Sequence, residues 1–266
     1  MLPKRTATVL ESIYRRFCRR DQAAFDPVHF LYEYPDAPRR EVAGLVASCL
    51  AYGRVMQICK SVADALDRIG LAGCERFEDV SEAHIRRSLA GFKHRFTTGD
   101  QLAGLLIGAR RAQIEHGSLQ ACFRRGLEAG AHDVVDATGR FVDELNRLSG
   151  ACAGHLLPHP AAGSACKRLN LYLRWMVRRD EVDPGGWDGV GTELLVIPMD
   201  VHMHRLSLRL GLTRRRAADM RSARETTAGF AAADPMDPVK YDFALTRMSI
   251  VDPAGLEALI SERGRS

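Results

Sequence analysis

The chain of 266 residues is 46% hydrophobic and 27% charged, which is ordinary for a globular protein and long enough for one large domain. No apolar stretch approaches 18 residues, which excludes an ordinary transmembrane helix, and the Arg-rich first 20 residues lack the apolar core of a secretory signal. The net charge of +5 permits a polyanionic partner without requiring one.

Apolar residues recur at helical spacing through most of the chain. One face of residues 39–52 is apolar, and Gly53 follows as a predicted C-cap. The same spacing predicts further helices over 54–69, 99–115, 134–147, 164–178, 216–230 and 238–249. Strand alternation is almost absent, and irregular Gly- and Pro-rich sequence concentrates at 148–163 and 180–198. The pattern predicts an all-α protein.

Prolines mark further helix starts, because five of the eleven follow an Asp. Asp at the N-cap accepts a backbone N–H that lacks a partner, and Pro at the next position has no N–H to leave unpaired. The five pairs are Asp26-Pro27, Asp183-Pro184, Asp234-Pro235, Asp237-Pro238 and Asp252-Pro253.

The cysteine and arginine content narrows the class of protein. None of the seven cysteines forms a C-x-x-C pair, which argues against a disulfide framework, a zinc ribbon or an iron–sulfur cluster and favours a reducing cytoplasm. The basic residues are 33 Arg and only 5 Lys. GC-rich coding explains this excess, and so does the use of Arg for bidentate phosphate contacts.

The densest group of candidate functional residues lies in 163–212, which is expected to form a helix opened by Ser164, a glycine-rich connection and a second helix starting near Asp200. Lys167, Arg174 and Arg178 are spaced to lie along one helix face. These features are ordinary when separate, since a cationic face is usually solvated and an Asp at this position is usually an N-cap. Together they can present charge and backbone N–H groups to phosphate.

The run Ile197–Leu206 with Leu210-Gly211-Leu212 resembles the V-D-T-H-V-x-R run and its continuation in helix-hairpin-helix DNA glycosylases, the endonuclease III superfamily. This resemblance covers mainly 163–212 and places the catalytic Asp of that superfamily on Asp200. Nearly the whole chain also resembles a widespread bacterial family of uncharacterised proteins, in the segments 26–31, 51–55, 167–178 and 237–242.

The sequence departs from the typical glycosylase pattern at several points. The L-P-G-V-G-x-K hairpin is absent, the C-terminal four-cysteine cluster is missing, and the usual position of the lyase Lys is occupied by Val182. The archaeal 8-oxoguanine glycosylase branch has a similarly extended hairpin and a Lys further upstream. By that comparison the matching residue is Lys167, 33 positions before Asp200.

The resemblance implies a DNA N-glycosylase, with or without AP-lyase activity, in which Lys167 is the nucleophile and Asp200 stabilises the oxocarbenium-like sugar. We expect the two side chains to lie within roughly 3–6 Å of each other in one cleft. The expected contacts to substrate or DNA come from Tyr52, Arg54, Gln57, Arg168, Arg174, Trp175, Arg178, Gly189, Gly191, His202 and Arg205.

The expected partner is double-stranded DNA with a damaged base, without cofactor, metal, membrane or obligate protein partner. Two other functions stay open: a nucleic-acid-binding protein that has lost catalysis, and a metal-dependent hydrolase using Asp200 and His202. His202 and His204 diverge by about 200° on a helix, so one metal could not easily use both. Several candidates also have structural explanations, such as a core position for Trp175 or Trp187 and a solvated face for the basic cluster 214–224.

The resemblance also predicts a domain organisation. We expect residues 1–266 to form a single two-lobed helical unit. Residues 1–38 and 163–266 would form one lobe, with the helix-hairpin-helix element at 164–211, and residues 39–162 would form the second.

Overall fold

The computed structural model describes residues 4–150 and 153–263, and these are mostly helical, so the all-α prediction is confirmed. The α-helices are α1 (Lys4–Phe17), α2 (Ala37–Cys49), α3 (Val55–Arg68), α4 (Glu82–Ser88), α5 (Gly99–His116), α6 (Leu119–Arg125), α7 (Val135–Ser149), α8 (Lys167–Val177), α9 (Val201–Arg209), α10 (Met220–Ala231), α11 (Tyr241–Val251) and α12 (Pro253–Arg263). Two-residue strands β1 (Lys93–His94) and β2 (Thr97–Thr98) pair antiparallel. Short 3-10 turns lie at Arg20–Ala23, Pro27–Glu33, Phe77–Asp79, Gly154–Leu156, Pro160–Ala162 and Thr192–Leu194.

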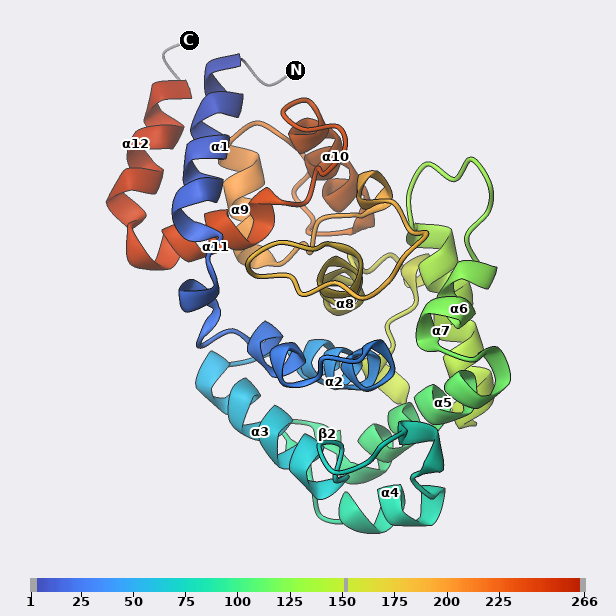
Figure 1. Cartoon of the computed structure of the whole chain (residues 1–266). Helices are drawn as coiled ribbons and strands as arrows, with labels where there is room; N and C mark the ends of the chain where they lie inside the picture. Colours follow the sequence, from blue (N-terminus) through green and yellow to red (C-terminus); the bar gives the residue numbers. More distant parts are fainter. Residues whose placement is uncertain (1–3, 151–152, 264–266) are drawn as a thin grey trace.

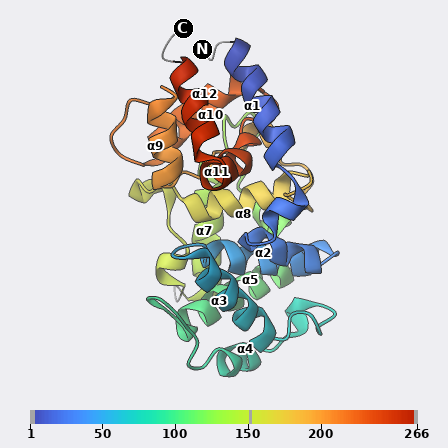
Figure 2. The ribbon, with the colours of Figure 1, turned by 90° about the vertical axis from the view of Figure 1, so that its left-hand side faces the viewer.

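The helices form two groups (Figure 1). α1 packs against α11, so both ends of the chain lie together with α9, α10 and α12. α2 to α7 form the second group, in which α5 packs closely along α7. α8, predicted to belong to the terminal lobe, packs against α2 and lies between the two groups (Figure 2).

Local chemistry explains several helix boundaries. Thr98 and Gln101 form a reciprocal capping box at the start of α5, and Gly117 ends that helix in the left-handed conformation, with a φ of 87°. Gly108 lies where α5 crosses α7, and a Cβ there would stand 2.8 Å from the Leu145 carbonyl oxygen. Only glycine therefore permits this close approach of the two helices.

Two of the five Asp–Pro pairs start helices as predicted. Asp26 caps the 3-10 turn Pro27–Glu33, and Asp252 accepts the Gly255 N–H at the start of α12. The prediction is wrong for the other three. Asp234 closes a turn, and no helix begins at Pro184 or Pro238, because Asp183 and Asp237 bind the guanidinium of Arg178.

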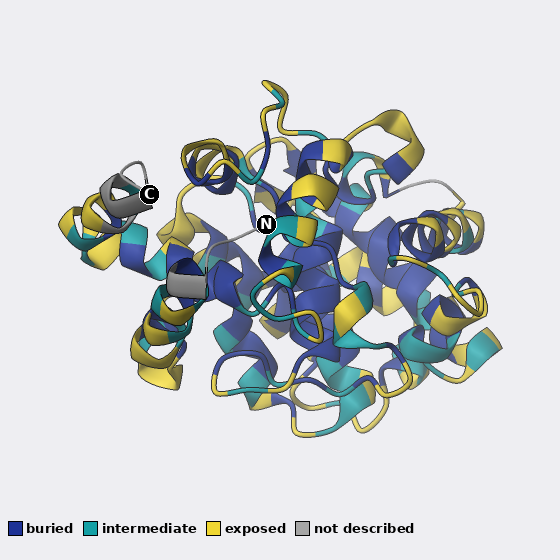
Figure 3. Ribbon diagram, turned by 90° about the horizontal axis from the view of Figure 1, so that it is seen from above, coloured by how far each residue is buried: buried dark blue, intermediate teal, exposed yellow. Residues whose placement is uncertain are grey.

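Buried residues fill the middle of the molecule, and exposed residues lie on the outer turns (Figure 3). α8 is buried from Leu169 to its end, which makes it the central element of the core. Within the described residues the cysteines are free thiols, and Cys152 lies outside those residues. No helix there is both long and apolar enough to cross a membrane.

Candidate active site

The N-terminus of α8 carries Lys167. The helix predicted to open at Ser164 begins three residues later, because Cys166 takes a left-handed conformation with a φ of 48° and its N–H donates to the Ser164 hydroxyl. This bend makes Lys167 the first helical residue. Its side chain is 32% exposed, so the amine can reach a ligand from solvent.

Asp200 caps α9 and faces Lys167. Its Oδ1 accepts the N–H groups of His202 and Met203, each at 2.9 Å. Its Oδ2 lies 3.6 Å from Lys167 Nζ, within the expected range, and the side chain is 36% exposed. Because one oxygen is held by the cap, the other is fixed in direction toward the amine. The amine and the carboxylate meet although 33 residues separate them.

Asp242 on α11 is a second, buried acidic residue of this region, and the sequence analysis did not single it out. Its carboxylate pairs with Arg174. Burial raises its pKa to about 6, and the negative charge of Asp200 adds to this effect, whereas Arg174 and Lys167 oppose it. The pKa of the buried Asp242 therefore depends on the charges of Lys167 and Asp200.

Arg174 and Arg178, expected to contact DNA, are each only 3% exposed, and that expectation is wrong for this structure. Arg174 Nε donates to Asp183 Oδ1 at 3.2 Å. Arg178 binds Asp237 through two nitrogens, each at 2.9 Å, and also pairs with Asp180 and Asp183. The two guanidinium groups thus join α8 to the connection 178–200 and to the segment before α11.

Trp175 is 1% exposed, so the prediction that it contacts the substrate or DNA is also wrong. Its indole nitrogen is buried without a hydrogen-bond partner. Trp187 is also buried and donates to Glu41 Oε1 at 2.9 Å. Both indoles belong to the core, since α8 is covered on all sides from Leu169 onward.

The glycine-rich connection was expected to present its backbone N–H groups to phosphate, but several of its groups contact the protein itself. The amides of Gly185 and Trp187 donate to carbonyls at the C-terminal end of α8. The Arg124 side chain lies against Gly189, and the Glu193 carboxylate lies against Gly191, where a Cβ would stand 2.1 Å from Oε1. An acidic group at this point repels phosphate. The Glu193 carboxylate therefore places negative charge beside Gly191, where the sequence predicts a contact with DNA.

Tyr52 and Arg168 are in contact near Lys167. The Arg168 guanidinium lies 5.4 Å from the centre of the Tyr52 ring. It also donates to the carbonyls of Cys49 and His155, so α8 is tied to the end of α2. The Tyr52 ring stacks on Phe96, with centroids 4.9 Å apart and an interplanar angle of 24°. Phe96 was missed by sequence reasoning, because a two-residue strand leaves no periodic signal.

The remaining predicted contact residues are exposed. Arg54 precedes α3, and Gln57 in its first turn donates to the Ser61 hydroxyl at 3.2 Å. His202 and Arg205 line a groove of about 220 Å³ between α9, α11 and α12. His204, in contrast, is buried and its Nε2 lies 2.9 Å from the Arg215 carbonyl oxygen, so the two histidines diverge as expected.

A second hollow, of about 670 Å³, lies between α7, residues 159–163 and α10. Members of the basic cluster 214–224 line it, but two of them are already paired with carboxylates, Arg215 with Asp219 and Arg224 with Asp133. Arg221 is exposed. The hollow is therefore polar and nearly balanced in charge rather than strongly cationic.

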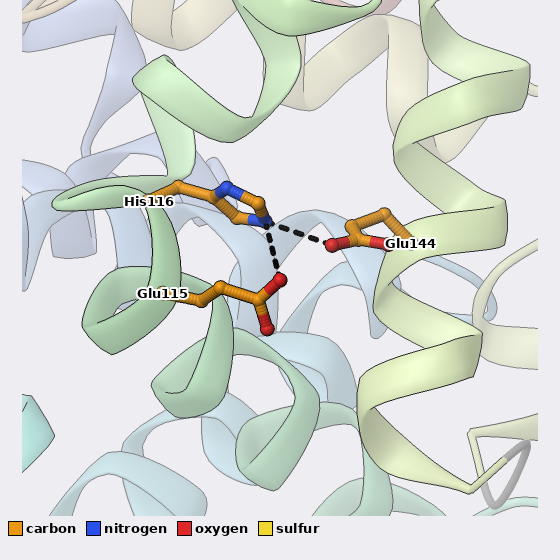
Figure 4. A group of neighbouring side chains, drawn as sticks. All are labelled: Glu115, His116 and Glu144. Carbon is orange, nitrogen blue, oxygen red and sulfur yellow. Dashed lines mark hydrogen bonds and ion pairs between the residues drawn. The ribbon is translucent and has the colours of Figure 1, made fainter.

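One group in the described part of the chain has the geometry of a metal site: Glu115, His116 and Glu144 (Figure 4). His116 Nε2 lies 2.8 Å from Glu144 Oε1, and Arg147 binds both carboxylates at 2.7–2.8 Å. The Arg147 guanidinium and His116 therefore occupy the oxygens that a cation would need. The group is an ion-pair network on the face of α5 and α7, far in sequence from Lys167 and Asp200.

A family model described as "Protein of unknown function (DUF2400)" matches residues 26–251. The match includes Lys167, Asp200 and Asp242, and it leaves out α1 and α12. No curated protein and no solved structure matches the chain.

Proposed function

Because the chain belongs to the DUF2400 family, whose description assigns no activity, we propose a function from the site itself: a DNA N-glycosylase with AP-lyase activity that acts through Lys167 and Asp200. The observation that carries this proposal is the 3.6 Å separation of Lys167 Nζ and Asp200 Oδ2. A primary amine beside a carboxylate whose direction is fixed by a helix cap can combine nucleophilic and electrostatic catalysis.

In the proposed reaction, Lys167 Nζ attacks C1′ of the deoxyribose of an extruded nucleotide. The N–C1′ bond forms, the glycosidic bond breaks and the base leaves with a proton, while Asp200 stabilises the positive charge that develops on the sugar. The proton lost by the amine passes to Asp200 Oδ2 and from there to the departing base. Ring opening gives a Schiff base, and loss of a C2′ proton then expels the 3′-phosphate.

Borohydride trapping on a duplex with an abasic site tests the lyase step without knowledge of the lesion. Borohydride reduces the Schiff base and leaves the protein covalently attached to DNA. We expect trapping by the unmodified chain and none by Lys167→Ala or Lys167→Arg, since a guanidinium keeps the charge but forms no imine. Lys60→Ala, which removes an exposed lysine on α3, is the matched control and should trap normally.

The other two functions give different results. Salt-dependent DNA binding without trapping or base release would favour a nucleic-acid-binding protein that lacks catalysis. The absence of the usual hairpin Lys after Gly189-Val190-Gly191 favours this second candidate. Activity lost with a chelator and restored by a metal would favour the hydrolase.

A further inference from the structure

The surface around Tyr52 and Phe96 combines an exposed aromatic ring with positive charge. Phe96 lies in the two-residue turn between β1 and β2 and is 61% exposed. One face of its ring stacks on Tyr52, and its ring centre lies 4.7 Å from that of His155. A ring held in this way loses little freedom on binding a further flat group, which makes it a preorganised stacking surface.

Hydrogen bonds fix this aromatic group to the candidate active site. The Tyr52 hydroxyl donates to the His94 carbonyl at 3.0 Å and lies against Thr97. Thr97 Oγ1 lies 2.9 Å from His155 Nε2. Arg168, next to Lys167 in α8, contacts both the Tyr52 ring and the His155 carbonyl. The hairpin, the end of α2 and the start of α8 therefore meet at one place.

The charge around this place is positive. The three stretches that build it, residues 42–63, 83–99 and 145–179, contain no Asp or Glu, although the chain has 33 acidic residues. Arg54 and Arg95 are exposed here, and the Arg95 side chain lies against Gly53. Burial lowers the pKa of both His94 and His155, with neighbouring Arg residues adding to the effect, so the positive charge at neutral pH comes from arginine and lysine.

We propose that the Phe96–Tyr52 pair is a binding surface for an unpaired base of single-stranded or locally opened DNA, with Arg54 and Arg95 contacting the adjoining phosphates. Aromatic rings beside cations are the usual means by which proteins hold unpaired nucleotides, because every base has a face that can stack. This inference deepens the proposed function and rests on it for the role of the bound strand. The binding itself can be tested independently of catalysis.

Fluorescence anisotropy with a labelled single-stranded oligodeoxynucleotide measures the affinity. We expect Phe96→Ala to raise Kd by about 5- to 150-fold, the usual range for losing one base–aromatic stack. Phe25→Ala is the matched control, because Phe25 is also 61% exposed but lies in the segment between α1 and α2. It should leave Kd unchanged.

Two further variants separate stacking from charge. In Phe96→Trp the added indole should be quenched when the oligonucleotide binds, whereas the buried Trp175 and Trp187 should not respond. Arg54→Gln should reduce the slope of log Kd against log salt by about 0.7, the contribution of one phosphate contact on a single strand. Phe96→Ala should leave that slope unchanged.

This inference would be overturned if the unmodified chain and Phe96→Ala bound the oligonucleotide with equal affinity, or if Phe25→Ala lost as much affinity as Phe96→Ala. It would also be overturned if Phe96→Trp showed no quenching, or if the unmodified chain did not bind the oligonucleotide. Its failure is distinguishable from failure of the proposed function. If trapping depends on Lys167 and Phe96→Ala binds the oligonucleotide as tightly as the unmodified chain, only the stacking surface is rejected. Phe96-dependent binding without trapping rejects the lyase alone.

Discussion

At the scale of single residues, Asp200 has two roles that one substitution separates. The cap on α9 needs an oxygen acceptor, which Asn provides as well as Asp. Stabilising a developing cation and accepting a proton need the negative charge, which Asn lacks. The cap and the proposed catalysis therefore use different properties of the same carboxylate.

We expect Asp200→Asn to stay folded and to bind DNA, but to lose base release by at least ~100-fold, the scale found for a key electrostatic group. Base release on damaged duplexes, with circular dichroism for folding, measures both. Asp36→Asn is the control, because Asp36 also caps a helix, α2, and pairs with a cation, Arg39. Near-normal activity of a folded Asp200→Asn variant would reduce Asp200 to a helix cap and remove the glycosylase proposal.

Sequence reasoning predicted some individual positions well and others poorly, for physical reasons. Lys167 and Asp200 lie on different helices, yet the prediction that their side chains lie within roughly 3–6 Å is confirmed by their separation of 3.6 Å. Arg174 and Arg178 were expected to contact DNA because helical spacing shows which helix face a residue lies on but not whether that face is buried. Their acidic partners come from residues 180–183, Asp237 and Asp242, which no local pattern connects to α8.

At the scale of secondary structure, the long helices were predictable and the short elements were not. α3, α5 and α7 fall within two residues of their predicted bounds, because amphipathic periodicity over 14 to 18 residues is a strong signal. α4 and α6 have only seven residues each, and the hairpin strands have two, so their sequences carry too few turns to show a period. The hairpin is the element that presents Phe96.

Glu41 joins several of these elements through one buried carboxylate. It accepts the N–H groups of Leu119 and Gln120 at the start of α6, the Gln113 amide of α5 and the Trp187 indole of the connection. Burial raises the pKa of Glu41, and these four donors oppose that effect by favouring the charged form. The carboxylate therefore adds, from a different helix, to the conventional N-cap of α6, in which the Ser118 hydroxyl accepts the Ala121 N–H.

We expect Glu41→Gln to lower the free energy of unfolding by about 2–3 kcal/mol, because its amide nitrogen faces N–H donors that lose their acceptor. Urea unfolding followed by circular dichroism measures the change, and Glu33→Gln, at an exposed site, should stay within about 0.5 kcal/mol of the unmodified chain. An equally small effect of Glu41→Gln would show that α6 does not depend on this carboxylate.

At the scale of the whole molecule, a buried ion-pair cluster joins α8 to both the connection 178–200 and α11. The cluster has two guanidinium groups and four carboxylates, so its formal charge is negative. Excess negative charge in a buried place favours protonation of one carboxyl group. Burial raises the pKa of both Asp183 and Asp242 in this cluster, and that of Asp242 reaches about 6.

This cluster makes stability depend on pH. An unfolded Asp has a pKa of about 3.9, so between about pH 4 and pH 6 the folded state binds more protons at Asp242 than the unfolded state does. The stabilising contribution of Asp242 is therefore full below about pH 4 and is lost as the pH rises through about 6. The difference in unfolding free energy between the unmodified chain and Asp242→Asn should fall by up to about 3 kcal/mol over that interval.

Urea unfolding at half-unit steps from pH 4 to pH 8 measures this difference, and Asp188→Asn at an exposed position should give a constant difference. If the difference in unfolding free energy between the unmodified chain and Asp242→Asn rises with pH, then Arg174 keeps Asp242 ionised in the folded state over the whole range. A constant difference for Asp242→Asn would mean that its carboxyl group does not titrate in this range.

The packing of α1 against α11 also has a consequence for the order in which the helices pack while the chain is synthesised. α1 ends at Phe17 and α11 ends at Val251, so at synthesis rates of about 5–20 residues per second α1 waits roughly 10–50 s for its partner. During that time its apolar residues Leu10, Ile13 and Phe17 have no native surface to cover them. α5 and α7 lie closer together in the sequence, so they can already pack against each other. A nascent chain paused before α11 emerges should therefore protect the amides of α5 and α7 from exchange while those of α1 exchange freely, and the two ends of the chain would close the molecule as its last step.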